Sequence, residues 1–182
     1  MVRWQWYEQE AEVRQAATQA IAQAAAAAIK ARGAFRLVLA GGSTPRAVYQ
    51  TLNALPTDWS KWYVYFGDER VLPVDHPDRN SVMVGSAWLE QSSIPLNQIY
   101  PIPTERGLVA AQASYMQTLA PLGAFDLVLL GLGEDGHTAS LFPNHDLGTV
   151  NDALDVLVVM DAPKPPPQRI SLSVQRLSNA HH

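Results

Sequence analysis

The sequence contains no cysteine and few charged residues, and both shortages narrow the range of functions. Without cysteine, disulfide bonds, thiolate zinc sites and a cysteine nucleophile are excluded, and a reducing compartment is the simpler expectation. Charged residues make up 16% of the 182 residues, and the formal net charge is −4. The 13 lysines and arginines form no basic run. We therefore expect no nucleic-acid partner, because such binding needs many cations against the phosphates.

Long apolar segments are also missing. Residues 20–29 are apolar by count, but they are mostly alanine, are interrupted by Gln23, and fall well short of the roughly 20 residues that a membrane span needs. The first residues lack the basic start and the continuous apolar core of a secretory signal. We therefore expect a soluble, cytoplasmic protein without a membrane partner.

Hydrophobic residues make up 47% of the chain, enough for the core of a single α/β domain over residues 1–182. Apolar residues at helical spacing predict a long helix that ends at Gly33. In the second helix, Thr44 is expected to be the N-cap and Pro45 the first helical residue. The predicted helices span residues 8–32, 44–55, 81–91 and 108–119. Short apolar runs predict strands at residues 35–40, 62–66, 125–130, 155–160 and 170–174.

Strands alternate with helices along the sequence, which predicts a Rossmann-like α/β fold. We expect an open, largely parallel sheet with helices on both faces. In such folds ligands bind beyond the carboxyl ends of the strands. The polar motifs of this sequence follow the predicted strands that end near Ala40, Phe66, Leu130 and Met160. We therefore expect these motifs to share one site.

The first motif is a glycine-rich turn, LAGGSTPR at residues 39–46, between a strand and a helix. Free backbone N–H groups at such a helix start can bind an anion, with Gly42, Ser43 and Thr44 as candidate contacts. The alternative is an ordinary tight turn with a capping hydroxyl, because the lysine of a P-loop is absent.

The second motif, FGDERVLP at residues 66–73, has three charged residues directly after an apolar strand. Charged groups there are costly unless they meet water or partners. In a functional interpretation, Asp68 has a polar or proton-handling role, and Arg70 binds a phosphate through charge-assisted hydrogen bonds. A solvated strand end with a local ion pair is the alternative.

The third motif, GLGEDGHTASLFP at residues 131–143, is the most informative. Its glycines match a dinucleotide-binding pattern, but the two acidic residues between them would repel a pyrophosphate and the next segment is a poor crossover helix. A better interpretation pairs Asp135 with His137. Histidine can accept a proton from water near neutral pH, and a nearby carboxylate can orient the ring. The alternative is a histidine that only caps the following helix.

The fourth motif, PKPPPQR at residues 163–169, also follows a strand. Consecutive prolines favour an extended segment, which would hold Lys164 and Arg169 rigidly for an anionic substrate. A stiff, solvated linker is the alternative. No metal site is predicted, because the cluster at residues 75–78 and the pair at residues 145–146 lack a third ligand at a standard spacing.

In this order, the motifs resemble those of the 6-phosphogluconolactonase family. The matching stretches are LAGGSTPR, YFGDERVLPVDHPDRNS, FDLVLLGLGEDGHTASLFP and DAPKPPPQRISL. The resemblance implies the α/β fold of sugar-phosphate isomerases and lactonases, and hydrolysis of 6-phosphoglucono-1,5-lactone to 6-phosphogluconate in the oxidative pentose phosphate pathway, without a metal or cofactor. It implies that His137 is the general base and Asp135 its neighbour, with Asp68 in the site in an unassigned role. The implied contacts to the phosphorylated sugar lactone are Ser43, Thr44, Arg70, Lys164 and Arg169.

Glucosamine-6-phosphate deaminases are close relatives with a comparable Asp-Gly-His loop. In those enzymes a glutamate in Asn-Glu-Pro follows and assists ring opening, whereas this sequence has Leu-Phe-Pro at residues 141–143. The lactonase interpretation is therefore preferred. Deaminase or isomerase activity, and sugar-phosphate binding without catalysis, are the alternatives.

Members of the family usually continue past a segment like SVQRLSNAHH into another strand and terminal helices. This sequence stops at His182. We therefore expect a C-terminally shortened domain whose exposed apolar face favours self-association, whereas a complete chain is expected to be a monomer.

Overall fold

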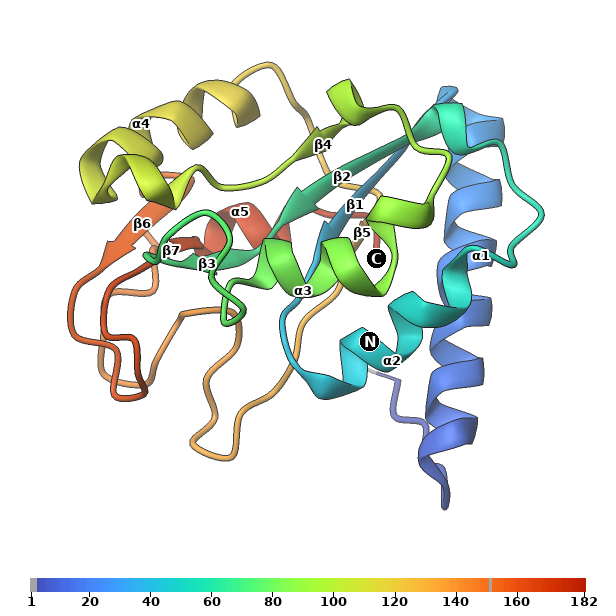
Figure 1. Cartoon of the computed structure of the whole chain (residues 1–182), viewed down its shortest axis with the longest axis horizontal. Coiled ribbons are helices and arrows are strands. Elements are labelled where there is room, and N and C mark those ends of the chain that lie inside the picture. Colours follow the sequence, from blue (N-terminus) through green and yellow to red (C-terminus); the bar gives the residue numbers. More distant parts are fainter. Residues whose placement is uncertain (1–2, 151) are drawn as a thin grey trace.

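The computed structural model describes residues 3–150 and 152–182 and has two sheets (Figure 1). The central sheet is parallel, in the order β4–β2–β1–β5. Its strands are β1 (Phe35–Leu39), β2 (Trp62–Phe66), β4 (Ile99–Tyr100) and β5 (Leu127–Val128). The second sheet is antiparallel, in the order β3–β7–β6. Its strands are β3 (Asp68–Arg70), β6 (Val156–Val159) and β7 (Arg169–Leu172).

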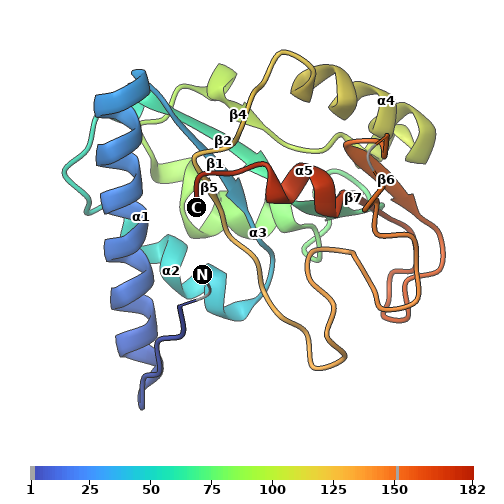
Figure 2. The same cartoon turned by 180° about the vertical axis from the view of Figure 1, so that it is seen from behind.

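Helices cover both sides of the central sheet, as the sequence predicts. They are α1 (Glu10–Arg32), α2 (Ser43–Leu52), α3 (Asn80–Ala87), α4 (Leu108–Leu119) and α5 (Val174–Ser178). Helix α3 lies in front of the strands in Figure 1, and α5 lies in front in the opposite view (Figure 2). Short 3₁₀ helices span Trp59–Lys61, Leu89–Gln91, Leu96–Gln98 and Thr104–Arg106. The expected α/β fold with a parallel sheet is therefore confirmed.

The last two predicted strands, β6 and β7, do not extend the parallel sheet. They pair with each other in antiparallel fashion, from Val156 opposite Leu172 to Val159 opposite Arg169. The physical reason is the short connection between them, because parallel neighbours need a crossover of a dozen or more residues. Strand β3 joins the same sheet, so the charged residues 68–70 form a strand rather than the solvated end of β2.

Two element boundaries differ from the prediction near the motifs. Helix α2 begins at Ser43, with Gly42 as its N-cap and no side-chain cap, so Thr44 is not the capping residue. The N-cap moves because Gly42 adopts a φ of 110°, which suits glycine and turns the chain earlier. The strand expected over residues 125–130 is limited to β5, because the register with β1 covers only Leu127 and Val128.

Two tyrosines hold the carboxyl ends of β1 and β2 from the helices that cover them. The Tyr49 hydroxyl of α2 donates to the Ala40 carbonyl and accepts from the Ala40 N–H, both at 2.9 Å. The Tyr115 hydroxyl of α4 makes the same pair of bonds with Phe66, at 2.9 and 3.1 Å. Burial raises the pKa of both hydroxyls. The backbone N–H and carbonyl groups of Ala40 and Phe66 therefore have protein partners and need no water.

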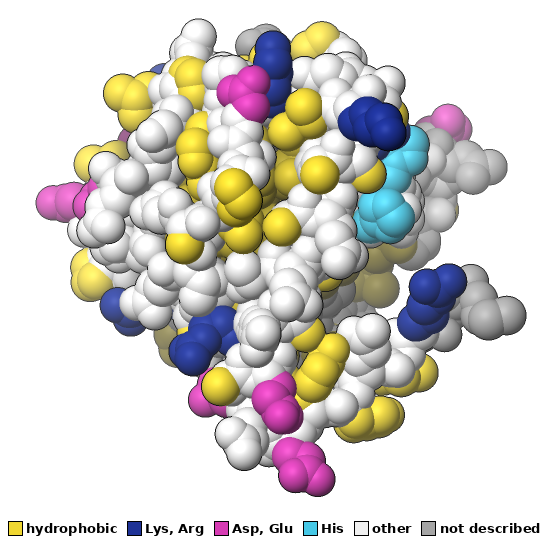
Figure 3. Space-filling view, turned by 90° about the vertical axis from the view of Figure 1, so that its right-hand side faces the viewer, with side chains coloured by type: hydrophobic (Ala, Val, Ile, Leu, Met, Phe, Trp, Pro, Cys, Tyr) yellow, Lys and Arg dark blue, Asp and Glu magenta, His cyan; other side chains and the backbone are white. Residues whose placement is uncertain are grey.

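Large hydrophobic side chains remain on the surface. Figure 3 looks onto the side of the molecule that carries α1, where hydrophobic side chains show between widely spaced charged ones. The exposed large residues include Trp4 and Trp6 before α1, whose rings stack with centroids 5.9 Å apart. Among the described residues, no helix combines the length and the apolar character that crossing a membrane requires.

Candidate functional site

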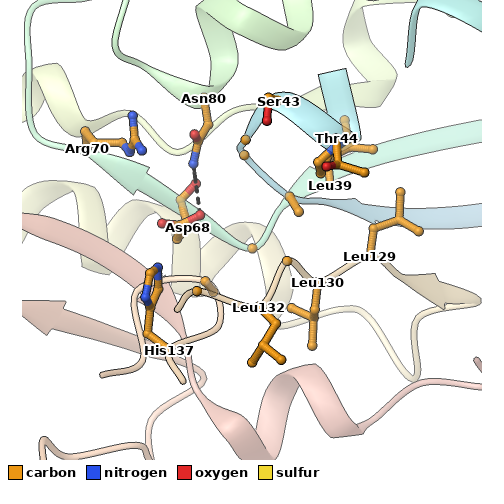
Figure 4. Close-up of a pocket in the computed structure, with 18 of the residues that line it drawn as sticks. Leu39, Ser43, Thr44, Asp68, Arg70, Asn80, Leu129, Leu130, Leu132 and His137 are labelled. Carbon is orange, nitrogen blue, oxygen red and sulfur yellow. Dashed lines mark hydrogen bonds between the residues drawn. The ribbon is translucent and has the colours of Figure 1, made fainter. Parts of the chain in front are cut away.

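A pocket of about 490 Å³ lies at the carboxyl ends of β1, β2 and β5 (Figure 4). Strands β2 and β4 lie on one side of β1, whereas β5, which follows them in the sequence, lies on the other side. This reversal is the position where open α/β sheets bind ligands. The residues that line it are Leu39–Pro45, Gly67, Asp68, Arg70, Asn80, Leu129–Gly133, His137, Ala139 and Arg169.

Asp68 lies in the floor of the pocket and is fully engaged by neighbours. Its Oδ1 accepts from Asn80 Nδ2 at 2.9 Å, and its Oδ2 accepts from Ser140 Oγ at 2.6 Å. Gly41 passes so close to this network that a Cβ there would lie 2.1 Å from Asn80 Oδ1. Asp68 therefore ties together β3, α3 and the segment around Ser140. Gly41, the first glycine of the first motif, has no room for a side chain.

Glu69, which the sequence analysis did not assign, organises the start of α3 although it is 0% exposed. Its Oε1 accepts from the backbone N–H of Asn80 at 2.7 Å, and its Oε2 accepts from that of Ser81 at 2.8 Å. Its Oε2 is also 3.5 Å from Arg79 Nε. A carboxylate favours a helix N-terminus, because the free N–H groups there carry partial positive charge. Glu69 thereby fixes Asn80, which in turn holds Asp68.

The second face of the pocket is the glycine loop, residues 131–139, which carries His137. His137 Nδ1 lies 2.5 Å from Asp135 Oδ1. This hydrogen bond lowers the pKa of Asp135 to about 2, so the carboxylate is charged at neutral pH. With Nδ1 engaged, Nε2 is the ring nitrogen free to accept a proton. This shape requires glycine at position 133, because a Cβ there would lie 2.1 Å from His137 Nδ1 and clash with the ring.

A buried phenylalanine supports the histidine from behind. The rings of Phe142 and His137 stack with centroids 4.8 Å apart and planes inclined by 29°. The Arg169 guanidinium lies 5.6 Å from the centroid of the Phe142 ring. Phe142 therefore limits the rotation of the His137 ring, and sequence analysis had no signal for this beyond its place in the third motif.

Two arginines bring positive charge to the pocket. Arg70 extends from β3 and lines the pocket (Figure 4). Its guanidinium donates to the Asp78 carbonyl. Arg169 comes from β7, and its pKa is lowered by burial and then by the nearby charge of Arg70, while Asp68 opposes the shift. Arginine keeps its proton in proteins, so both side chains remain cations. Together with the N–H groups at the start of α2, they provide the charge that an anionic substrate requires.

Most of the predicted site residues therefore come together. Lys164 does not line the pocket, and its Nζ lies instead 3.6 Å from Asp135 Oδ1. The proline-rich segment around it bends at residues 163–166 and has a cis peptide between Pro165 and Pro166, rather than running fully extended. Within residues 3–150 and 152–182, no three His, Asp or Glu side chains come together as metal ligands.

Known proteins resemble this chain over most of its length. The sequence profile described as glucosamine-6-phosphate isomerases/6-phosphogluconolactonase matches residues 8–182. The 6-phosphogluconolactonase of Nostoc sp. is 43% identical over 136 residues, which are 70% of this chain and 57% of that relative. The 6-phosphogluconolactonase of Mycobacterium tuberculosis is 37% identical over 179 residues, which are 91% of this chain and 72% of that relative. This chain thus spans little more than half the length of the Nostoc protein.

Solved structures agree with the sequence matches. The 6-phosphogluconolactonase of Trypanosoma brucei superposes with a TM-score of 0.86 at 27% identity, over 97% of this chain and 78% of that one. That of Thermotoga maritima superposes with a TM-score of 0.84 at 26% identity, over 92% and 76%. The profile match covers nearly the whole sequence, and the fold is the same. This chain belongs to the glucosamine-6-phosphate isomerase/6-phosphogluconolactonase family.

Proposed function

We propose that this protein hydrolyses 6-phospho-D-glucono-1,5-lactone to 6-phospho-D-gluconate. The observation that carries the proposal is the hydrogen bond between His137 and Asp135 in a pocket lined by two arginines. A histidine with one nitrogen held by a carboxylate is arranged as a general base. The cations opposite it suit a substrate that carries a phosphate.

In the proposed reaction, the phosphate of the lactone binds at the start of α2, where Gly42, Ser43 and Thr44 line the pocket, together with Arg70 and Arg169. His137 Nε2 takes a proton from water as the water oxygen forms a bond to the lactone carbonyl carbon. The bond between that carbon and the ring oxygen then breaks, and the ring oxygen takes the proton back from His137. Asp135 stabilises the imidazolium that exists between the two steps.

Asp68 is proposed to position the site rather than to transfer the proton. Both of its oxygens already accept hydrogen bonds from Asn80 and Ser140. These two bonds hold the carboxylate in a fixed orientation, which suits a positioning role. Its negative charge also lies among the cations, which keeps Arg70 and Arg169 from repelling each other across the pocket.

The isomerase branch of the family is the competing assignment, and the third motif argues against it. The stretch that would supply the ring-opening carboxylate is Leu141–Phe142–Pro143 here, and both Leu141 and Phe142 are buried hydrophobic residues. No carboxylate from that stretch can reach a substrate. Ammonia release from glucosamine 6-phosphate would favour the isomerase branch instead.

The test is lactone hydrolysis by the wild type and by His137→Ala. Freshly prepared 6-phosphogluconolactone is followed above its spontaneous hydrolysis, and circular dichroism verifies that each protein is folded. We expect the variant to lose roughly 10²–10⁴-fold in rate, the usual contribution of a general base. His181→Ala is the matched control, because His181 donates its backbone N–H to the carbonyl of Phe125, which precedes β5, and His181 does not line the pocket. If the folded wild type does not accelerate lactone hydrolysis, the proposed activity is wrong. Sugar-phosphate binding without catalysis would then be the remaining interpretation.

We also propose a setting for this activity. The reaction belongs to the oxidative pentose phosphate pathway, and the absence of cysteine suits a cytoplasmic location, although two rice relatives are named chloroplastic. One buried cluster includes side chains from both sheets, which supports a single domain. The exposed Trp4 and Trp6 favour self-association over a monomer of 19.9 kDa, and the mass in solution tests this.

A further inference from the structure

Lys164 stands next to the catalytic pair proposed above, but not where a phosphate contact is needed. Its ammonium group lies 3.6 Å from Asp135 Oδ1, the oxygen that also contacts His137 Nδ1 at 2.5 Å. One carboxylate oxygen therefore faces a lysine on one side and the histidine on the other. Lys164 comes from the β6–β7 connection, so this contact joins two segments that are far apart in the sequence.

The backbone around Lys164 is held by a buried group. Arg169 Nη2 donates to the carbonyls of Lys164 and Pro165 at 3.0 and 3.2 Å, and Arg169 Nε donates to that of Pro166 at 3.1 Å. Arg169 is itself 4% exposed. Three successive carbonyls thus converge on one guanidinium. The lysine is presented to Asp135 by a pre-ordered segment, which lowers the entropy cost of the contact.

We infer that Lys164 is a positioning residue that acts on His137 through Asp135, and not a contact to the substrate phosphate. This inference rests on the proposed function, because it concerns the same general base. The lysine holds the carboxylate in place and draws part of its charge away from the imidazole. Without the lysine, the carboxylate would be left to the imidazole alone, an arrangement that favours the imidazolium.

Other charged groups also face the pair. Arg70 and Asp68 from β3 and Arg169 from β7 line the same pocket, and Glu134 precedes Asp135 in the loop. On the far side of Phe142, His145 pairs with Asp161 at 3.4 Å. All of these remain in place when only Lys164 is replaced. A change in the titration of His137 in a Lys164 variant is therefore attributed to loss of the lysine charge.

The direct test is an NMR titration of the His137 imidazole, assigned with His137→Gln. In Lys164→Met the midpoint should rise by about 0.5 pH unit, the size expected for removal of one nearby charge in a water-exposed site. Lys164→Arg should restore the wild-type midpoint. Lys61→Met removes an equal charge from an exposed residue before β2, at the other end of the sheet, and should leave it unchanged. An unmoved midpoint in Lys164→Met would overturn the inference.

Kinetics separate the inference from a phosphate contact. For Lys164→Met we expect a lower kcat at pH 7, an acid limb moved to higher pH and a KM within about twofold of the wild type. A KM raised tenfold or more with an unmoved acid limb would instead assign Lys164 to the phosphate. If the wild type does not hydrolyse the lactone, the proposed function fails, and the NMR titration still decides whether the lysine acts on His137.

Discussion

The face of the pocket formed by β3 and α3 is buried and cross-linked, whereas the glycine loop opposite is exposed and held mainly by its own contacts. Asp68, Glu69 and Asn80 are at most 5% exposed, and their side chains bond to several segments. In the glycine loop, Leu132 is 79% exposed. The backbone bonds there are local, from Gly133 to the His137 carbonyl at 2.8 Å and from Gly136 to the Gly133 carbonyl at 2.9 Å.

This difference assigns stability and chemistry to different parts of the site. The buried face orders the groups that are proposed to bind an anion, and it does so with charges that would be costly if left unpaired. The loop carries the proposed general base, as is common where a rigid scaffold positions a reactive side chain. Substitutions in the buried face should therefore lower the free energy of unfolding, and substitutions in the loop should mainly lower kcat.

The largest effect on stability is expected for Glu69→Ala. It removes the acceptor of the Asn80 and Ser81 N–H groups and leaves the buried Arg79 without its inner partner. Loss of one member of a buried pair costs about 3–5 kcal/mol, and urea unfolding should show a decrease of this size. Glu105→Ala is the matched control, because Glu105 also pairs with Arg79, at 3.0 Å, but its side chain is 35% exposed.

The control should cost about 0–1 kcal/mol, as for other exposed pairs. Equal losses in the two variants would contradict the comparison, because burial would then not decide the cost. Since both glutamates face the same arginine, the difference between the two losses reports the burial of Glu69 together with its bonds to the backbone N–H groups of Asn80 and Ser81.

A smaller loss is expected where the tyrosines hold the strand ends. Tyr49→Phe leaves the Ala40 N–H and carbonyl without a partner, and Tyr115→Phe does the same for Phe66. Unsatisfied buried groups cost about 1–3 kcal/mol, which thermal or urea unfolding can measure. Tyr63→Phe should change stability by less than about 0.5 kcal/mol, because the Tyr63 hydroxyl has no such backbone pair in the described residues. A similar loss in all three variants would argue against this role of the hydroxyls.

The sequence predicts the position of the site better than its supporting contacts. Apolar strands that end in glycine and polar residues place Ser43, Asp68, Arg70 and His137 at one edge of a parallel sheet, and the pocket brings them together. Local patterns carry this information, because a parallel sheet aligns the carboxyl ends of its strands. The resemblance of the motifs then selects the family.

The contacts of the supporting residues join segments that are far apart in the sequence. A local sequence pattern therefore cannot predict them. Asn80 and Ser140 meet at Asp68 although 12 and 72 residues separate them from it. From the sequence alone, Glu69 is expected to be a surface charge. In the structure it is buried against Arg79 and the start of α3. The antiparallel pairing of β6 and β7, in contrast, could have been predicted from the short connection between them.

In the exposed glycine loop, the charge of Asp135 decides how kcat/KM depends on pH. The hydrogen bond from His137 lowers the pKa of Asp135 from 3.8 to about 2. A lowered pKa means that this carboxylate stabilises the folded state above about pH 4, and that its contribution is lost only as the pH falls through about 2. Asp135 therefore does not titrate between pH 4 and 9. In that range the acid limb of kcat/KM should fall tenfold per pH unit, the slope for one proton.

Asp135→Asn should move this acid limb to lower pH, because the imidazolium loses its counter-charge. The plateau of kcat should fall by roughly tenfold, a part of the 10²–10⁴-fold that a general base contributes, since the ring loses its orienting partner. The melting temperature at pH 7 should fall only slightly, because solvent screens the stabilising contacts of the exposed Asp135 carboxylate. A hundredfold fall per pH unit in the wild type, or a limb that moves to higher pH in Asp135→Asn, would contradict this account. The shift is opposite in sign to that expected for Lys164→Met, so the two variants together test whether the carboxylate is shared between His137 and Lys164.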